Sequence, residues 1–141
     1  MKNYMSNYIS NIKIADKAGF CFGVKRAIDL SEKIVAKEHK VYTLGPIIHN
    51  PQEVERLERK GIKIIKDPKN VKSGSIILRT HGIPLKLHKK LKKNKNINII
   101  DTVCPFVKRA HDIVKRLSTD VNSKDKTIIL IGEKIHPEVI A

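Results

Sequence analysis

Short apolar runs rich in β-branched residues alternate along the chain with longer segments whose apolar positions recur every three or four residues. The short runs are typical of buried strands. We expect them at residues 12–15, 40–44, 62–65, 75–79, 97–100 and 127–131. A regular alternation of strands with helices predicts an α/β fold on a mostly parallel sheet.

The segments between these runs have the spacing and the end signals of helices. We expect helices at 23–39, 51–61, 84–96 and 105–118, and a polar loop at 118–126. The helices at 51 and 105 both begin at a proline, which is favoured at the first helical position. The helix expected at 84–96 carries apolar residues on one side and lysines on the other.

Length and composition indicate a globular protein. The chain has 141 residues, of which 40% are hydrophobic and 30% are charged, which is ordinary for one folded domain. Its polar N-terminus lacks the apolar core of a secretory signal, and no window approaches the roughly 18 apolar residues that span a bilayer. We therefore expect a cytoplasmic location and no membrane partner.

The charge of the chain narrows the class of partner. Lys and Arg outnumber Asp and Glu by 29 to 14, which gives a formal net charge of +15 and favours anionic ligands. The lysine-rich segment at 84–96 is read as a solvated helix face in preference to a nucleic-acid site. Three Phe, three Tyr and no Trp also leave few rings for stacking bases, so no nucleic-acid partner is expected.

Cysteine or histidine residues, which can bind metals or transfer protons, follow most of the expected strands. Loops at the strand exits carry Cys21, His49, His81, Cys104 and His136. The carboxyl ends of parallel strands meet at one edge of a sheet, and ligands bind in the crevice there. Residues far apart in sequence are therefore expected to meet. The presence of all five at one expected edge is stronger evidence for a functional site than any one of them alone.

His49, Cys104 and His136 lie at or next to expected helix starts. Asn50, Cys104 and His136 each precede a proline, and a helix N-terminus stabilises a thiolate and attracts phosphate. Glu138 would lie in a first helical turn, either as a residue favoured by the helix dipole or as a proton carrier near a phosphate-bearing ligand.

Each candidate also has a purely structural interpretation. A free cysteine is often a small buried apolar residue, and a loop histidine is often only a capping group. Two cysteines are too few for a disulfide framework, so free thiols or metal ligation are favoured. His39, His88 and His111 lie away from the expected edge and are treated as structural.

An ordered set of motifs carries a family resemblance. These are GFCFGVKRAI (19–28), GPIIHNPQEVERLERKGI (45–62), RTHG (79–82), DTVCPFV (101–107) and HPEV (136–139). From about residue 13 to its last residue, the chain resembles the LytB or IspH family of 4-hydroxy-3-methylbut-2-enyl diphosphate reductases. The family makes isopentenyl and dimethylallyl diphosphate in the non-mevalonate isoprenoid pathway.

The resemblance implies an iron-sulfur reductase with a 4Fe-4S cluster held by three cysteines. Cys21 and Cys104 match the first two cluster cysteines. By the same resemblance, the substrate's diphosphate is bound by three histidines and protons are relayed by one acid, which match His49, His81, His136 and Glu138. The implied partners are the allylic diphosphate substrate and a ferredoxin or flavodoxin as electron donor.

The resemblance also implies a protein of three α/β lobes. Residues 1–104 would form the first lobe, and residues 105–141 would begin the second, which is incomplete here. The family pattern continues beyond Ala141 and supplies the third cysteine there. We therefore expect the 141-residue chain to be a fragment without activity of its own.

Two other functions remain open. Cys21, Cys104 and two of the histidines could form a tetrahedral zinc site in a small α/β domain without enzyme activity. A basic nucleic-acid-binding module is ranked last, because it leaves the Cys and His loops unexplained.

Overall fold

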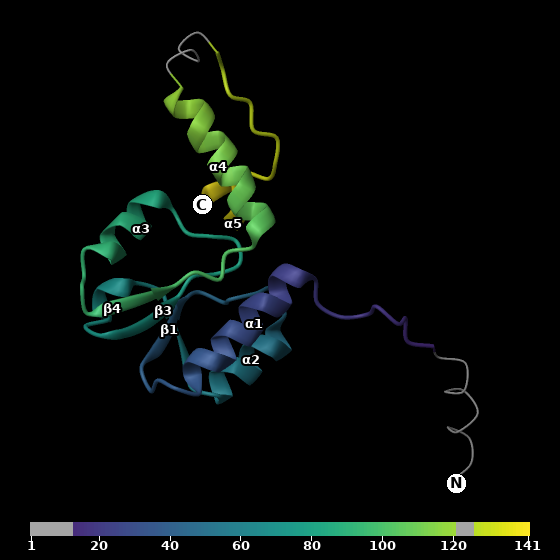
Figure 1. The fold of residues 1–141 in the computed structure, drawn as a ribbon, viewed down its shortest axis with the longest axis vertical. Helices are drawn as coiled ribbons and strands as arrows, with labels where there is room; N and C mark the ends of the chain where they lie inside the picture. The colour runs from purple at the N-terminus through teal and green to yellow at the C-terminus, as the bar shows by residue number, and fades with distance from the viewer. Residues whose placement is uncertain (1–12, 121–125) are drawn as a thin grey trace.

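The computed structural model describes residues 13–120 and 126–141, which form an α/β fold on a four-stranded parallel sheet (Figure 1). The strands are β1 (Val41–Leu44), β2 (Ile62–Ile65), β3 (Gly74–Ile77) and β4 (Ile97–Ile100). Their order across the sheet is β2-β1-β3-β4, and every pairing is parallel. The predicted fold class is confirmed.

Helices follow the strands as the apolar spacing predicted. The structure contains α1 (Phe22–Val35), α2 (Pro51–Arg59), α3 (Leu85–Lys92), α4 (Pro105–Thr119), α5 (Pro137–Ile140) and the 3₁₀ turn η1 (Pro68–Asn70). Both α2 and α4 begin at the predicted proline. The helix predicted at 23–39 ends four residues early, because residues 36–37 form a turn before β1.

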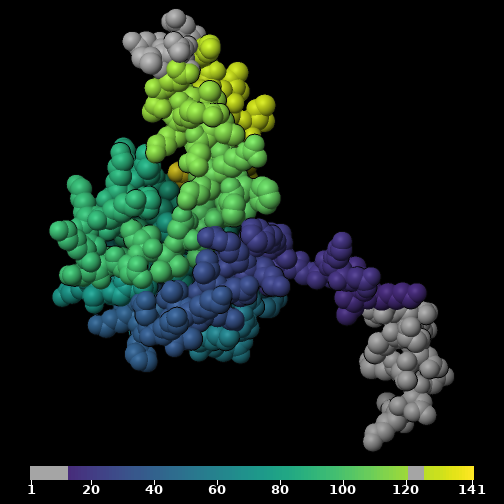
Figure 2. All heavy atoms as spheres, in the orientation of Figure 1, coloured from purple at the N-terminus to yellow at the C-terminus, as the bar shows by residue number. Residues whose placement is uncertain are grey.

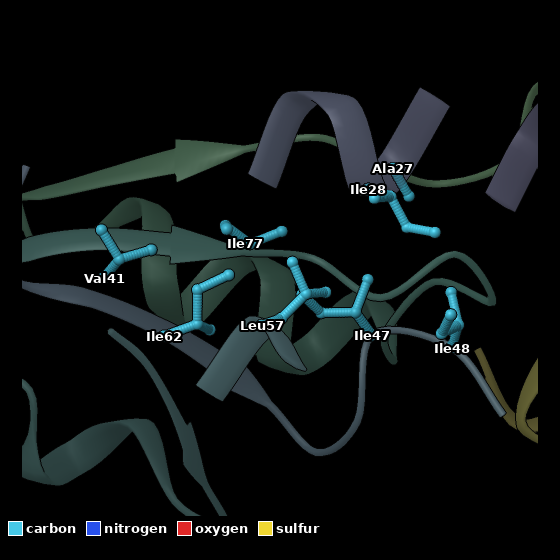
Figure 3. Packing of buried hydrophobic residues seen from close by; sticks show 8 residues of the cluster. All are labelled: Ala27, Ile28, Val41, Ile47, Ile48, Leu57, Ile62 and Ile77. Carbon is cyan, nitrogen blue, oxygen red and sulfur yellow. The ribbon is translucent and has the colours of Figure 1, made fainter. Parts of the chain in front are cut away.

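Helices cover both faces of the sheet, and each face has its own apolar core. On one face α1 and α2 pack on the sheet (Figure 1); this core is labelled in Figure 3 and consists of Ala27, Ile28, Val41, Ile47, Ile48, Leu57, Ile62 and Ile77. On the other face α3 contributes Leu91 to a core with Leu44, Val71, Ile76, Leu78, Ile83 and Ile97. Burial of these apolar residues stabilises the packing of helices on both faces of the sheet.

The order of the strands creates a switch point between β1 and β3. The chain leaves β1 toward β2 on one side and returns to β3 on the other side of β1. The loops that follow β1 and β3 therefore diverge to opposite faces of the sheet. A crevice at such a switch point is the usual ligand site of an open parallel sheet.

The part of the chain from Pro105 onward projects from this body. Figure 2 shows α4 and the segment after residue 126 rising together above the body. α4 has no buried residue, and its apolar side chains Phe106, Ile113, Val114 and Leu117 are exposed. Within the described part of the chain, no helix is long and apolar enough to cross a membrane.

Two of the strand predictions are wrong for the residues that the structure describes. Residues 13–15 and 127–131 have no strand structure, and Ile14 and Ile131 are 82% and 93% exposed; Ile12 lies outside the described residues. A strand is stabilised by pairing as well as by its own composition. Neither segment pairs with the four-stranded sheet, so the apolar pattern alone does not make it a strand.

Candidate active site

Three histidines from three separate loops lie side by side. The ring centroids of His49 and His81 are 4.3 Å apart, those of His49 and His136 6.3 Å, and those of His81 and His136 6.2 Å. We call these residues the histidine group. His81 is buried, His136 is partly buried and His49 is exposed, so the group forms a polar surface with one deep member.

The switch point explains why the first two histidines meet. His49 follows β1 and His81 follows β3, and these strands are neighbours in the sheet. Thr80 fixes the two loops together, because its backbone N–H and its hydroxyl both donate to the Ile47 carbonyl, at 3.2 and 3.1 Å. This link holds His81 beside the loop that carries His49.

His136 reaches the group from the far end of the chain. It is the N-cap of α5, where its Nδ1 accepts a hydrogen bond from the Glu138 N–H at 3.3 Å. The helix is held in place by His111 of α4, whose Nε2 lies 3.0 Å from the Glu138 carbonyl oxygen. Gly82 also packs here, since a Cβ on it would lie 3.2 Å from the Ala141 Cβ. His111 therefore positions α5.

Burial lowers the pKa of the deepest histidine. His81 is 8% exposed, and its pKa is lowered chiefly by desolvation and then by the neighbouring His49. Arg79 and His136 lower it further, whereas the Glu138 carboxylate raises it. Glu138 therefore lies close enough to favour a proton on His81, and an anionic ligand would act in the same direction.

The free energy of unfolding should depend on pH through His81. Because its folded-state pKa is lowered, the unfolded chain binds more protons below about pH 6.5, so stability falls as the pH is lowered from there through the folded pKa. Urea unfolding of wild type and His81→Asn at pH 7.5 and 5 measures this dependence, and the variant should lose less unfolding free energy between the two pH values.

His88, with a pKa lowered by burial and Lys92, contributes to the pH dependence with the same sign, so His88→Asn is the companion variant. Equal losses in wild type and His81→Asn would contradict the prediction.

The two cysteines cap two different helices. Cys21 is the N-cap of α1 and is exposed, and Cys104 is the N-cap of α4 and is partly buried. Both thiols are free, and neither side chain makes a capping hydrogen bond. Each cysteine thus lies at a helix N-terminus, beside backbone N–H groups that have no partner within the helix.

The Cys104 loop is anchored to the loop that carries His81. The Cys104 N–H donates to the Thr80 carbonyl at 2.9 Å, and the buried Thr102 hydroxyl donates to the Leu78 carbonyl. Sequence reasoning missed both threonines as positioning residues. The available signal was a hydroxyl one or two positions before a candidate His or Cys.

Gly23 brings the start of α1 against Cys104. A Cβ placed on Gly23 would lie 2.6 Å from the Cys104 Sγ and 3.2 Å from its Cβ, which is closer than real Cβ atoms approach. Cys21 is two residues earlier in the chain. The absence of a side chain at residue 23 therefore allows the first turn of α1 to approach the Cys104 side chain closely. Within residues 13–120 and 126–141, no hydrogen bond or ring contact joins the Cys21 side chain to the histidine group.

The described residues do not complete a metal site by themselves. In the part of the chain that the structure describes, no three His, Cys, Asp or Glu side chains are arranged to hold a metal ion together. A tetrahedral zinc site needs four ligands, so the zinc alternative is not formed by the described residues.

Comparison with known proteins identifies the family. The sequence model of the LytB protein family matches residues 12–141. This chain belongs to the LytB family. Among the curated relatives of this LytB chain, 4-hydroxy-3-methylbut-2-enyl diphosphate reductase of Aquifex aeolicus is 46% identical over 92% of the chain, and that of Geobacter sulfurreducens is 43% identical over 91%.

Solved structures support the same assignment. The LytB chain aligns with a structure of (E)-4-hydroxy-3-methyl-but-2-enyl diphosphate reductase with a TM-score of 0.73 and 46% identity, over 92% of the chain and 44% of that structure. It aligns with the E-1-hydroxy-2-methyl-but-2-enyl-4-diphosphate reductase of Plasmodium falciparum with a TM-score of 0.74 and 36% identity, over 89% and 38%. The LytB chain therefore spans less than half the length of the relatives it matches.

Proposed function

We propose that this chain forms part of a reductase that converts 4-hydroxy-3-methylbut-2-enyl diphosphate to isopentenyl and dimethylallyl diphosphate. The proposal rests on one observation above the others, namely the three histidine rings within 4.3 to 6.3 Å of one another at the switch point of a LytB-family sheet. Imidazole N–H groups from three loops suit a ligand with several phosphate oxygens. The names of the relatives supply the substrate.

In the proposed site Cys21 and Cys104 would hold a 4Fe-4S cluster, and the third thiolate would come from outside these 141 residues. The observed fit is that both thiols are free at helix N-termini and that Gly23 leaves room for the Cys104 side chain. Helix N-termini favour the negative charge of thiolate ligands. When bound, the cluster would supply electrons and a Lewis-acidic iron for loss of the C4 hydroxyl.

The histidine group would orient the substrate. His49, His81 and His136 would donate hydrogen bonds to diphosphate oxygens, which fixes the allylic carbon beside the cysteine loops. His81 starts with a lowered pKa, so an arriving diphosphate favours its imidazolium form and strengthens the contact. Glu138, which already acts electrostatically on His81, would carry the proton that leaves with the hydroxyl.

The remaining assignments extend the same proposal. Residues 1–104 would be the first lobe of the reductase and residues 105–141 the beginning of the second. The net charge of +15 suits an acidic electron donor such as ferredoxin or flavodoxin, in a cytoplasmic setting.

Activity should require more than this chain. We expect no turnover by the 141-residue chain reconstituted anaerobically with iron and sulfide, because it supplies two thiolates and an Fe-S cluster depends on a fuller set. A chimera that joins residues 1–141 to the remaining portion of the A. aeolicus relative should reduce the diphosphate substrate with dithionite-reduced dye as electron source. A folded, iron-loaded chimera without turnover would contradict the proposed function. Equal rates for both proteins would contradict the need for further ligands.

A further inference from the structure

Arg26 links α1 to the loop before Cys104. Its guanidinium donates to the Asp101 carbonyl oxygen at 3.1 Å and to the Val103 carbonyl oxygen at 3.3 Å. These contacts cross more than 70 positions of sequence. They join α1, the helix capped by Cys21, to the segment that precedes Cys104.

The segment that Arg26 binds, residues 101–103, is held in a turn by the Asp101 side chain. The Asp101 carboxylate accepts the Val103 N–H at 3.0 Å and the Lys108 ammonium at 3.1 Å. The first of these bonds is an Asx-type turn, which directs the carbonyl groups of Asp101 and Val103 toward α1. Arg26 therefore binds a preformed pair of acceptors.

Gly23 and Arg26 lie on the same side of α1. They are three residues apart, which places them on one helix face. Gly23 contacts the Cys104 side chain and Arg26 contacts the two carbonyls just before it. One face of α1 thus contacts both the Cys104 side chain and the carbonyls of Asp101 and Val103, and that face begins two residues after Cys21.

We propose that Arg26 is a positioning residue that fixes the Cys104 thiol relative to the Cys21 thiol. The proposal rests on the proposed function in one respect, namely that both thiols ligate the same group. Arg26 itself does not touch that group. It acts by holding the Asp101–Val103 carbonyls against α1, so that both sulfurs are presented in one arrangement before a ligand arrives.

Arginine suits this role better than lysine. Its planar guanidinium carries several N–H donors in a rigid fork and can bind two acceptors at once, whereas a lysine ammonium is a flexible point charge. Arg26→Lys should therefore restore part of the link, and Arg26→Met should remove it. Lys25 is exposed on another face of the same helix, so Lys25→Met loses the same charge without losing the link.

The test uses cadmium ion as a probe of paired thiols in the 141-residue chain. Wild type and Lys25→Met should bind one Cd²⁺ through both cysteines, seen as thiolate-to-cadmium absorption with two sulfurs per metal. Arg26→Met should weaken Cd²⁺ binding roughly tenfold or more, as loss of an orienting outer partner does at other metal sites. Arg26→Lys should fall between them, and urea unfolding should show the variants folded at the assay conditions.

Each result decides the proposal. Wild-type cadmium binding through one sulfur only would overturn it, as would an Arg26→Met chain with wild-type affinity. If Arg26→Met and Lys25→Met weaken binding equally, charge rather than position is responsible, which also overturns it. The assay needs neither iron nor the diphosphate, so its failure is distinct from failure of the chimera to turn over substrate.

Discussion

The substitution Gly74→Ala is expected to remove a large share of the free energy of unfolding. Gly74 begins β3 with φ +114°, and a Cβ there would lie 2.4 Å from the Lys40 carbonyl oxygen and 2.7 Å from the Lys40 Cβ. The same oxygen accepts the Ser75 N–H at 2.9 Å, so the backbone cannot retreat without breaking the start of the β1–β3 pairing. Backbone strain adds about 1–3 kcal/mol. We expect a total loss above roughly 4 kcal/mol, which is a large share of a typical domain's stability.

Gly61→Ala is the matched control for this prediction. Gly61 has φ +111°, close to that of Gly74, but its added Cβ would meet only the Val35 Cγ2 at 3.4 Å. It therefore carries the strain of the backbone conformation without the clash. Urea unfolding followed by circular dichroism gives both free energies, and similar losses in the two variants would show that the Lys40 contact is unimportant.

The second large effect concerns Cys21 and Cys104 in the chimera with the A. aeolicus relative. Cys21→Ala and Cys104→Ala should each lose bound iron and reduce turnover to background, because an Fe-S cluster cannot replace a missing thiolate with a methyl group. The fold should remain, since Cys21 is exposed and Cys104 only partly buried. Iron content, visible absorbance and dye oxidation measure the effect.

Serine variants separate the ligand role from the capping role. Both cysteines are helix N-caps without a side-chain capping bond, and serine is a preferred N-cap residue. Cys104→Ser should therefore keep or raise the unfolding free energy while it still loses iron. Normal iron content in either serine variant, with turnover retained, would refute the assignment of that cysteine as a ligand.

Local patterns predicted the sheet where each strand has a partner. The runs at 62–65 and 97–100 match β2 and β4, and the proline starts at 51 and 105 match α2 and α4. The run at 127–131 is as apolar and as β-branched as these but forms no strand. Composition reports the tendency of a segment to lie in a sheet, whereas pairing depends on which other strands are beside it.

The candidate site was partly accessible to the same reasoning. Neighbouring strand ends explain why His49 and His81 meet, since β1 and β3 are adjacent. The approach of His136 depends on α4 and α5 and on contacts such as that between His111 and Glu138, which no local pattern encodes. The Arg26 link is similarly long-range, because its two acceptors are backbone carbonyls that any residue could supply.

The exposed apolar segment at 127–131 also affects whether copies of this chain associate at high concentration. It has β-branched residues, no charge and no proline, which is the composition from which intermolecular sheets grow. Mutual repulsion between molecules of charge +15 opposes that growth, and dissolved ions screen the repulsion within about a nanometre at 0.1 M. Dilute buffer therefore keeps the molecules apart, and added salt promotes their precipitation.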